Sequence, residues 1–289
     1  MNTAVVRLMR PHHYLKNLFI LAPLFFGLKV YQPELLARAA TAFLGFSLAA
    51  SAVYILNDYY DQESDRAHPV KKNRPLAAGL VTRTEALLLM AVCLAGGMAI
   101  TFLAGTAPVA LTLVYVLVMI AYTVKLKHVA LIDVFIIAAG FVLRLFVGAE
   151  TIGISLSMWI VLITFLLALF LALAKRRDDY VLYKEDGRRT RKVIEHYNIP
   201  LLDAAMVLMS SVTVVAYIMY TISPEVIARA RTDKLYLTAG FVIFGIMRYM
   251  QLTFVYRTSG SPTKLLMHDG FLKASVIGWI AAFALLLYR

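Results

Sequence analysis

Long apolar runs are the feature that most constrains what this chain can fold into. Nine such runs follow one another along the sequence, and charged residues fall almost entirely between them. About 20 consecutive apolar residues are enough to cross a bilayer as an α-helix. The runs therefore predict an all-α membrane protein with about nine transmembrane helices. They cover approximately residues 15–31, 36–57, 85–104, 107–124, 129–148, 157–174, 203–222, 235–256 and 271–288.

The polar segments between the runs are short. The longest extends only from Lys175 to about Asn198, so no soluble domain fits between the spans. We expect one polytopic domain over residues 1–289, arranged around a polar cavity that faces the cytoplasm. The first run contains Asn17 and Pro23, and we expect it to be bent or partly interfacial. We also expect it to be retained as a span, because no small-residue cleavage site follows it.

The charge of the chain is explained better by membrane topology than by nucleic-acid binding. The chain is 61% hydrophobic and carries a formal net charge of +12, from 29 Lys and Arg against 17 Asp and Glu. Most of these cations fall in the polar segments on the side of the N-terminus. Cytoplasmic segments are enriched in Lys and Arg. The pattern therefore predicts a cytoplasmic N-terminus and no nucleic-acid partner.

An acidic stretch, residues 57–65, closes the second apolar run. If the helix continues through it, Asn57, Asp61 and Asp65 recur at every fourth residue, and Asp58 lies three residues before Asp61. All four then share one helical face. Carboxylates at a helix C-terminus oppose the macrodipole, so a bound cation would compensate them. Hard oxygen ligands suit Mg²⁺, which binds one or two carboxylates and substrate phosphates. The alternative is a solvated polar edge at the end of a transmembrane helix.

Basic residues lie on the same predicted face of the membrane, where a phosphate could bind. A cationic loop containing Arg74 follows the acidic stretch, which suits a diphosphate held between metal and arginine. The candidates for substrate binding are Lys16, Asn17, Arg74, Lys125, Lys127, Lys175, Arg176, Arg177 and Asp179. Membrane anchoring is the alternative for each cation, and we prefer it for Arg7 and Arg10. For Arg144, deep in its run, we favour a structural role with Glu150 as a partner.

These motifs carry a resemblance. The pattern Asn57-Asp58-x-x-Asp61-x-x-x-Asp65 after the second run resembles that of the UbiA superfamily of intramembrane prenyltransferases, and the similarity covers essentially the whole chain. The resemblance implies an all-helical enzyme that holds a diphosphate through Mg²⁺ at two aspartate-rich motifs and opens a lipid-facing cavity. The chain departs at the second motif, where Lys175-Arg176-Arg177-Asp178-Asp179 replaces a repeated Asp-x-x-x-Asp.

A narrower branch, the decaprenyl-phosphate phosphoribosyltransferases, resembles the chain at these departures too. The shared segments are Arg10-Pro11, Lys16-Asn17, Asn73 to Leu76, Leu126 to His128 with Asp133, Gly140 to Arg144, Lys175 to Arg177, and Ser261 to Thr263. This resemblance implies Mg²⁺-dependent transfer of a 5-phosphoribosyl group from phosphoribosyl diphosphate to a polyprenyl phosphate. It further implies an active site on the cytoplasmic side of a bacterial inner membrane. The sequence leaves open whether the protein is an oligomer.

The resemblance also implies residue roles. Asn57, Asp58, Asp61 and Asp65 would be catalytic, with Asp58 and Asp61 as the metal ligands. Lys16, Arg74, Lys125 and Lys127 would hold the leaving diphosphate, Lys175, Arg176 and Arg177 the 5-phosphate, and Asp179 the ribose hydroxyls. Two other functions stay open. One is an ordinary prenyltransferase that joins a prenyl diphosphate to an aromatic or other acceptor. The other is a non-catalytic lipid transporter.

Overall fold

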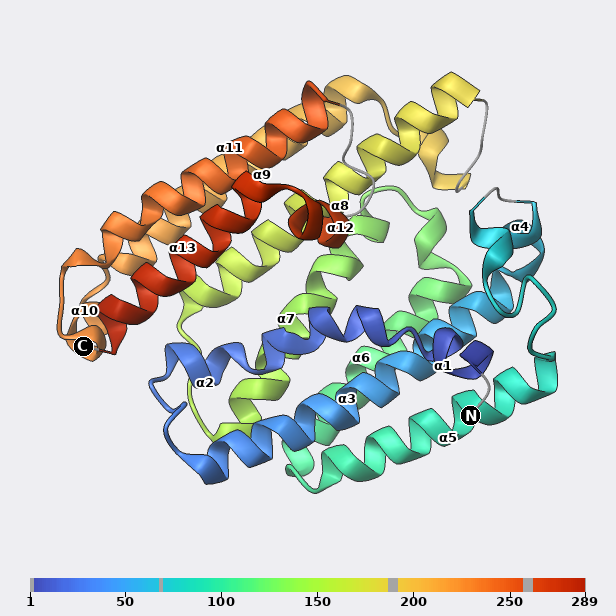
Figure 1. Ribbon diagram of the computed structural model, residues 1–289, viewed down its shortest axis with the longest axis horizontal. Coiled ribbons are helices and arrows are strands. Elements are labelled where there is room, and N and C mark those ends of the chain that lie inside the picture. The colour runs from blue at the N-terminus through green and yellow to red at the C-terminus, as the bar shows by residue number, and fades with distance from the viewer. Residues whose placement is uncertain (1–2, 68–69, 187–191, 257–261, 289) are drawn as a thin grey trace. The chain divides into compact units, whose positions relative to one another are not determined.

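The computed structural model describes residues 3–67, 70–186, 192–256 and 262–288, and every regular element within these ranges is a helix (Figure 1). The chain divides into two compact units, residues 1–156 and 157–289. The prediction of a single domain over residues 1–289 stays a prediction.

Within the described residues, eight helices are long and apolar enough to cross a membrane. This confirms the predicted all-α, multi-pass membrane protein. The first unit holds α3 (Pro33–Tyr60), α5 (Arg83–Phe102), α6 (Thr106–Val124) and α7 (Ile132–Ile152). The second holds α8 (Met158–Asp186), α9 (Ile199–Thr221), α11 (Ala239–Phe254) and α13 (Gly270–Leu287). These helices correspond to eight of the nine apolar runs.

The first apolar run is not one continuous helix. The N-terminal segment consists of α1 (Thr3–Met9), the 3₁₀ helix η1 (Pro11–Ile20) and α2 (Ala22–Phe26). Pro11 is the first residue of η1 and Pro23 the second residue of α2, and proline removes a backbone donor that a continuous helix needs. Between α1 and η1, Arg10 has a positive φ of 54°, which turns the chain. The expectation of a bent first segment is thus confirmed.

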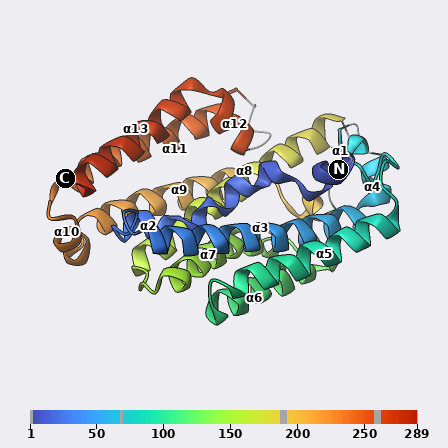
Figure 2. The same cartoon turned by 60° about the horizontal axis from the view of Figure 1, so that its bottom comes forward.

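Helix α3 is the centre of the first unit and contacts α1, η1, α5, α6 and α7. Figures 1 and 2 show α5 running alongside α3. Small residues permit this approach: a Cβ added to Gly97 would lie 2.6 Å from the Ala49 nitrogen. A Cβ added to Gly45 would likewise lie 2.6 Å from the Thr101 nitrogen. The core beside this contact contains Phe46 of α3, whose ring lies 4.6 Å from that of Tyr115 in α6.

Short elements connect the long helices of the first unit on the side that the sequence predicts to be cytoplasmic. Helix α4 (Gln62–Arg66) follows α3, η2 (Lys71–Asn73) precedes Arg74, and η3 (Leu126–His128) connects α6 to α7. Gln62 donates to the Leu76 carbonyl at 3.0 Å, and Arg66 to that of Ala77 at 3.3 Å. These two bonds attach the segment that contains Leu76 and Ala77 to α4.

The second unit is built from two helix pairs. Helix α8 packs on α9, and α11 packs on α13 (Figure 1). Its shorter elements are η4 (Lys192–His196), α10 (Pro224–Ala230), η5 (Lys234–Thr238) and α12 (Pro262–His268). Asp269 accepts a hydrogen bond from the Leu272 nitrogen at 2.8 Å, which caps α13, and pairs with Arg248 of α11 at 2.7 Å. The pair explains why an arginine within an apolar run is tolerated.

Candidate active site

The acidic stretch keeps its helical spacing although α3 ends at Tyr60 and α4 begins at Gln62. The Asp61 nitrogen donates to the Asn57 carbonyl at 2.9 Å, and the Asp65 nitrogen donates to the Asp61 carbonyl at 2.8 Å. The i to i−4 pattern therefore passes through the junction between the helices. Asp58 and Asp65 are only 2% and 3% exposed. The structure thus confirms that one face gathers the predicted acidic residues.

Two arginines neutralise the two buried carboxylates. Arg74 donates from Nη1 to Asp65 Oδ2 at 2.5 Å and to Asp58 Oδ1 at 3.1 Å. Arg10 donates to the same Oδ1 of Asp58. The left-handed backbone of Arg10, at the start of η1, brings this side chain to the end of α3. Buried carboxylates are stable as anions only when paired and hydrogen-bonded, and these pairs meet that condition.

The expectation that Arg10 is a membrane anchor was wrong. Its guanidinium pairs with Asp58 and lies 5.6 Å from the centre of the Tyr54 ring, which fixes the side chain from two sides. Only the Arg10-Pro11 segment of the sequence resemblance pointed to this residue. Arg7 donates instead to the Asn73 carbonyl at 3.2 Å, on the loop that precedes Arg74.

Asp61 is held by residues from two parts of the first unit. Lys127 of η3, which is 7% exposed, donates to Asp61 Oδ1 at 2.5 Å. Asn57 donates to Oδ2 of the same carboxylate at 3.0 Å. Lys125, two residues before Lys127, is exposed at the end of α6, and no ion pair of it occurs among the described residues. The structure therefore brings Lys127 to the acidic cluster and leaves Lys125 at its edge.

The three carboxylates and three cations form one charge-balanced cluster, which we call the acidic cluster. It consists of Asp58, Asp61 and Asp65 with Arg10, Arg74 and Lys127. Its carboxylate oxygens are the donors that Mg²⁺ prefers, and its cations are those that bind phosphate.

The cluster fits a metal that is completed by a substrate. In the described part of the chain, no group of three or more His, Cys, Asp or Glu forms a protein-only metal cage. Mg²⁺ does not need one, since it uses one or two carboxylates and phosphate oxygens. The ion pairs engage only Oδ1 of Asp58 and only Oδ2 of Asp65, so one oxygen of each carboxylate lies outside them. Asp58 and Asp61 as the metal ligands remain a prediction.

Asn17 and Arg144 belong to a second, deeper network in the same unit. Arg144 of α7 donates to Asn17 Oδ1 at 2.8 Å, to the Gly140 carbonyl at 2.7 Å and to the Tyr115 hydroxyl at 3.0 Å. Asn17 in turn donates to Ser47 Oγ at 2.9 Å. The expected pairing of Arg144 with Glu150 was wrong. Arg144 points to η1 and α6, whereas Glu150 is exposed at the far end of α7.

Lys16, the residue before Asn17 in η1, is half-buried. The other predicted residues lie on α8 of the second unit. Arg176 is 1% exposed and donates to Asp179 Oδ2 at 2.5 Å. Arg177 donates to Asp203 of α9 at 2.6 Å and to the Thr253 carbonyl of α11 at 3.0 Å. Arg177 is thus engaged in joining three helices. Lys175 is exposed. The predicted motif at residues 261–263 includes Ser261, which lies outside the described residues.

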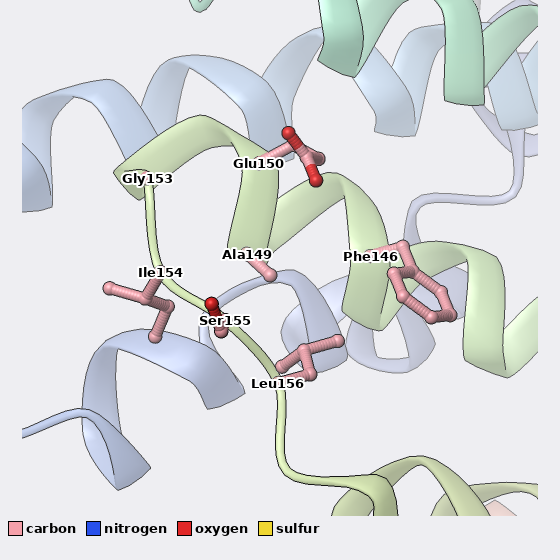
Figure 3. A pocket seen from close by; sticks show the side chains of 7 residues that line it. All are labelled: Phe146, Ala149, Glu150, Gly153, Ile154, Ser155 and Leu156. Carbon is pink, nitrogen blue, oxygen red and sulfur yellow. The ribbon is translucent and has the colours of Figure 1, made fainter.

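A pocket of about 250 Å³ opens at the other end of α7 from the acidic cluster. Figure 3 shows its lining, from the last turn of α7 and the segment after it: Phe146, Ala149, Glu150, Gly153, Ile154, Ser155 and Leu156. None of the predicted site residues lines it. Its one charged residue is the acidic Glu150, and no cation lines it, so it offers a phosphate no opposite charge.

Comparison with known proteins gives a consistent picture. The pattern of the UbiA prenyltransferase family matches residues 18–286. The decaprenyl-phosphate phosphoribosyltransferase of Mycolicibacterium smegmatis is 30% identical over 99% of this chain and 93% of its own length. The Mycobacterium tuberculosis protein of the same name is 31% identical over 96% of this chain and 92% of its own length.

Solved structures share the fold. A UbiA homolog from Archaeoglobus fulgidus bound to GPP and Mg²⁺ superposes with a TM-score of 0.73 at 20% identity. The match covers 99% of this chain and 100% of that one. A UbiA homolog from Aeropyrum pernix K1 superposes with a TM-score of 0.64 at 17% identity, over 97% and 98% of the two chains. The chain therefore belongs to the UbiA prenyltransferase family and is a membrane-embedded transferase.

Proposed function

We propose that this protein transfers the 5-phosphoribosyl group of phosphoribosyl diphosphate to a polyprenyl phosphate of the decaprenyl type. The reaction requires Mg²⁺ and takes place at the cytoplasmic side of a bacterial inner membrane. The observation that carries the proposal is the acidic cluster, in which hard oxygen ligands and phosphate-binding cations meet at the end of α3. The relatives that share about 30% of the residues over nearly the whole chain support the choice of substrates.

The cluster suits a leaving diphosphate. We assign Asp58 and Asp61 as ligands of Mg²⁺, and Asn57 and Asp65 as residues that ligate it or hold those ligands. Bound there, Mg²⁺ would neutralise negative charge that develops on the diphosphate. Arg74 and Lys127 already lie against the carboxylates, so each can donate to diphosphate oxygens without a large movement. Lys125 is assigned to the outer edge of the same group.

The chemistry needs charge stabilisation more than proton transfer. An oxygen of the polyprenyl phosphate forms a bond to C1 of the ribose. The C1 to diphosphate oxygen bond breaks, and its electron pair leaves with the diphosphate. The attacking oxygen is already anionic near neutral pH, so no general base is required. Donors aimed at the leaving group supply the main stabilisation.

We assign Lys175 and Arg176 to the 5-phosphate and Asp179 to the ribose hydroxyls, as the sequence predicts. The bond from Arg176 to Asp179 supports this assignment, because it gives both side chains a defined position. Arg177 has two partners within the protein, which makes it the weakest of the predicted phosphate ligands.

The first test is transfer of label from radioactive phosphoribosyl diphosphate into a polyprenyl phosphate by the purified protein. We expect label in the organic phase with Mg²⁺ and none with EDTA. Asp58→Asn and Asp61→Asn should lower turnover at least a thousandfold, because each removes a metal ligand. Glu63→Gln is the matched control: Glu63 is an exposed carboxylate of the same stretch, and its variant should keep wild-type turnover.

The other outcomes identify other functions. Wild-type turnover in both aspartate variants would refute the assignment of the metal ligands. Transfer from a prenyl diphosphate to an aromatic acceptor, without transfer of phosphoribosyl label, would make the protein an ordinary prenyltransferase. No activity in either assay would favour a lipid transporter without catalysis.

A further inference from the structure

Arg144 is a buried cation with no anionic partner among the described residues. It is 4% exposed, and its hydrogen bonds go to the oxygens of Asn17, Gly140 and Tyr115 and to the Tyr54 side chain, all of which are neutral. Burying an unpaired charge costs free energy, and a ligand of opposite charge would lower this cost. The cations of the acidic cluster differ in this respect, since each of them has a carboxylate.

Lys16 is a second cation in the same place. It precedes Asn17 in η1 and is half-buried, and no hydrogen bond or ion pair of its side chain occurs among the described residues. Its neighbour in the sequence, Asn17, accepts a hydrogen bond from Arg144. Arg10 is neutralised by Asp58. Lys16 and Arg144 are therefore two cations next to Asn17 that have no carboxylate partner among the described residues, and we call them the basic locus.

The guanidinium of Arg144 is held rigidly. Its central carbon lies 4.7 Å from the centre of the Tyr115 ring, 5.1 Å from that of Phe46 and 5.3 Å from that of Phe141. A guanidinium has five N–H donors. The hydrogen bonds to Asn17, Gly140 and Tyr115 use three of them, and Tyr54 is a fourth partner. One donor thus remains for a ligand, and aromatic rings surround the group. This arrangement suits a phosphate attached to an apolar tail.

The basic locus lies on the membrane side of the acidic cluster. Tyr54, a hydrogen-bond partner of Arg144, is one helical turn before Asp58, or about 6 Å along α3. Ser47, the partner of Asn17, is about 16 Å before Asp58 by the same rise. A phosphate held here would be deeper in the apolar part of the unit than a diphosphate at Asp58. That order fits a lipid phosphate better than a phosphate of the water-soluble donor.

We propose that Lys16 and Arg144, with Asn17 positioning the guanidinium, bind the phosphate of the polyprenyl phosphate acceptor. This rests on the proposed function and moves Lys16 from the leaving diphosphate to the attacking phosphate. The two cations hold the phosphate and orient one oxygen toward the ribose carbon. They also select a phosphomonoester over the corresponding neutral alcohol.

The test measures the binding of each ligand by itself, so that no transfer takes place. Wild type and Lys16→Met in lipid nanodiscs are titrated separately with farnesyl phosphate, with farnesol, and with phosphoribosyl diphosphate plus Mg²⁺. We expect Lys16→Met to weaken farnesyl phosphate binding at least tenfold, because a charge-assisted hydrogen bond is lost. Farnesol and phosphoribosyl diphosphate binding should change less than twofold. Lys29→Met is the matched control, since Lys29 is also a half-buried lysine of the N-terminal segment, near its other end.

Arg144→Lys is the second variant, and it keeps the charge but loses the planar fork. We expect it to weaken farnesyl phosphate binding at least tenfold as well. Unchanged farnesyl phosphate binding in Lys16→Met would overturn the proposal, and so would a loss of phosphoribosyl diphosphate binding instead. Failure of the proposed function is a separate result. It would appear as wild-type protein that binds farnesyl phosphate but transfers no phosphoribosyl label.

Discussion

At the scale of single residues, Arg74 contributes most to the balance of the acidic cluster. It is the one cation of the cluster that pairs with two carboxylates, Asp58 and Asp65, and both are buried. Removing one partner of a buried pair leaves the other charge unpaired, which costs more than the pair itself contributes. The loop that carries Arg74 is also held in place. Gln62 donates to the Leu76 carbonyl in this loop, and Arg66 donates to the Ala77 carbonyl.

Arg74→Gln should therefore lower the free energy of unfolding by about 2 kcal/mol, a moderate value because the arginine is partly exposed. Added Mg²⁺ should restore part of this loss, since it supplies a cation to the same carboxylates. The measurement is the unfolding temperature in detergent with and without Mg²⁺. Arg83→Gln is the control, because Arg83 donates to the neutral Gln62 and is exposed. Equal destabilisation of both variants, with no response to Mg²⁺, would contradict the account.

At the scale of elements, the close approach of α3 and α5 holds the acidic cluster in place, since α3 carries it. Adjacent glycines of α5 have opposite surroundings. Gly97 faces the backbone of α3, where a Cβ would lie 2.6 Å from the Ala49 nitrogen. Gly96 has nothing within 4 Å of the same position. Substituting each of the two glycines therefore distinguishes the effect of a glycine on helix packing from its effect on helix stability.

Gly97→Ala should destabilise the protein by about 1–3 kcal/mol, because the added methyl group overpacks the contact between two backbones. Gly96→Ala should be neutral or stabilise by up to about 1 kcal/mol, because alanine favours a helix. Thermal unfolding of the two variants, prepared in parallel, checks both values. If the two substitutions had the same effect, the close contact between α3 and α5 would be incorrect.

At the scale of the whole molecule, the distribution of charge predicts how the chain crosses the membrane. Cations gather in the segments that contain the acidic cluster, and such segments face the cytoplasm in most membrane proteins. The chain has a single cysteine, Cys93, which is buried. Its replacement by alanine therefore gives a background in which one new cysteine reports one location.

In the Cys93→Ala background, Lys72→Cys, near the acidic cluster, should react with a membrane-impermeant thiol reagent only from the cytoplasmic side. Thr106→Cys, at the first residue of α6, should react only from the opposite side, because α5 crosses the membrane between the two positions. Both residues are exposed in the folded protein, so a reaction reports the side of the membrane. Labelling of the two positions from reversed sides would invert the predicted topology.

The sequence by itself determined the class of fold and the acidic face. An apolar run of sufficient length becomes a transmembrane helix through its own composition, and eight of the nine runs did so. The spacing of Asn57, Asp61 and Asp65 needs only local helical geometry, which continues across the junction of α3 and α4. The order of short motifs along the chain indicated the family, because it does not depend on contacts between helices.

Only the tertiary structure decided which charges meet. Arg10 reaches Asp58 across 48 residues, Lys127 reaches Asp61 across 66, and Arg144 reaches Asn17 across 127. Sequence reasoning misjudged Arg10 and the partner of Arg144 because a cation near an apolar run can serve as an anchor or as a partner. The local sequence pattern is the same for a cation that anchors a helix in the membrane and for one that pairs with a distant residue. The choice between them depends on how η1, α3 and α7 pack, and that packing depends on close contacts such as the one between Gly148 and Ile20.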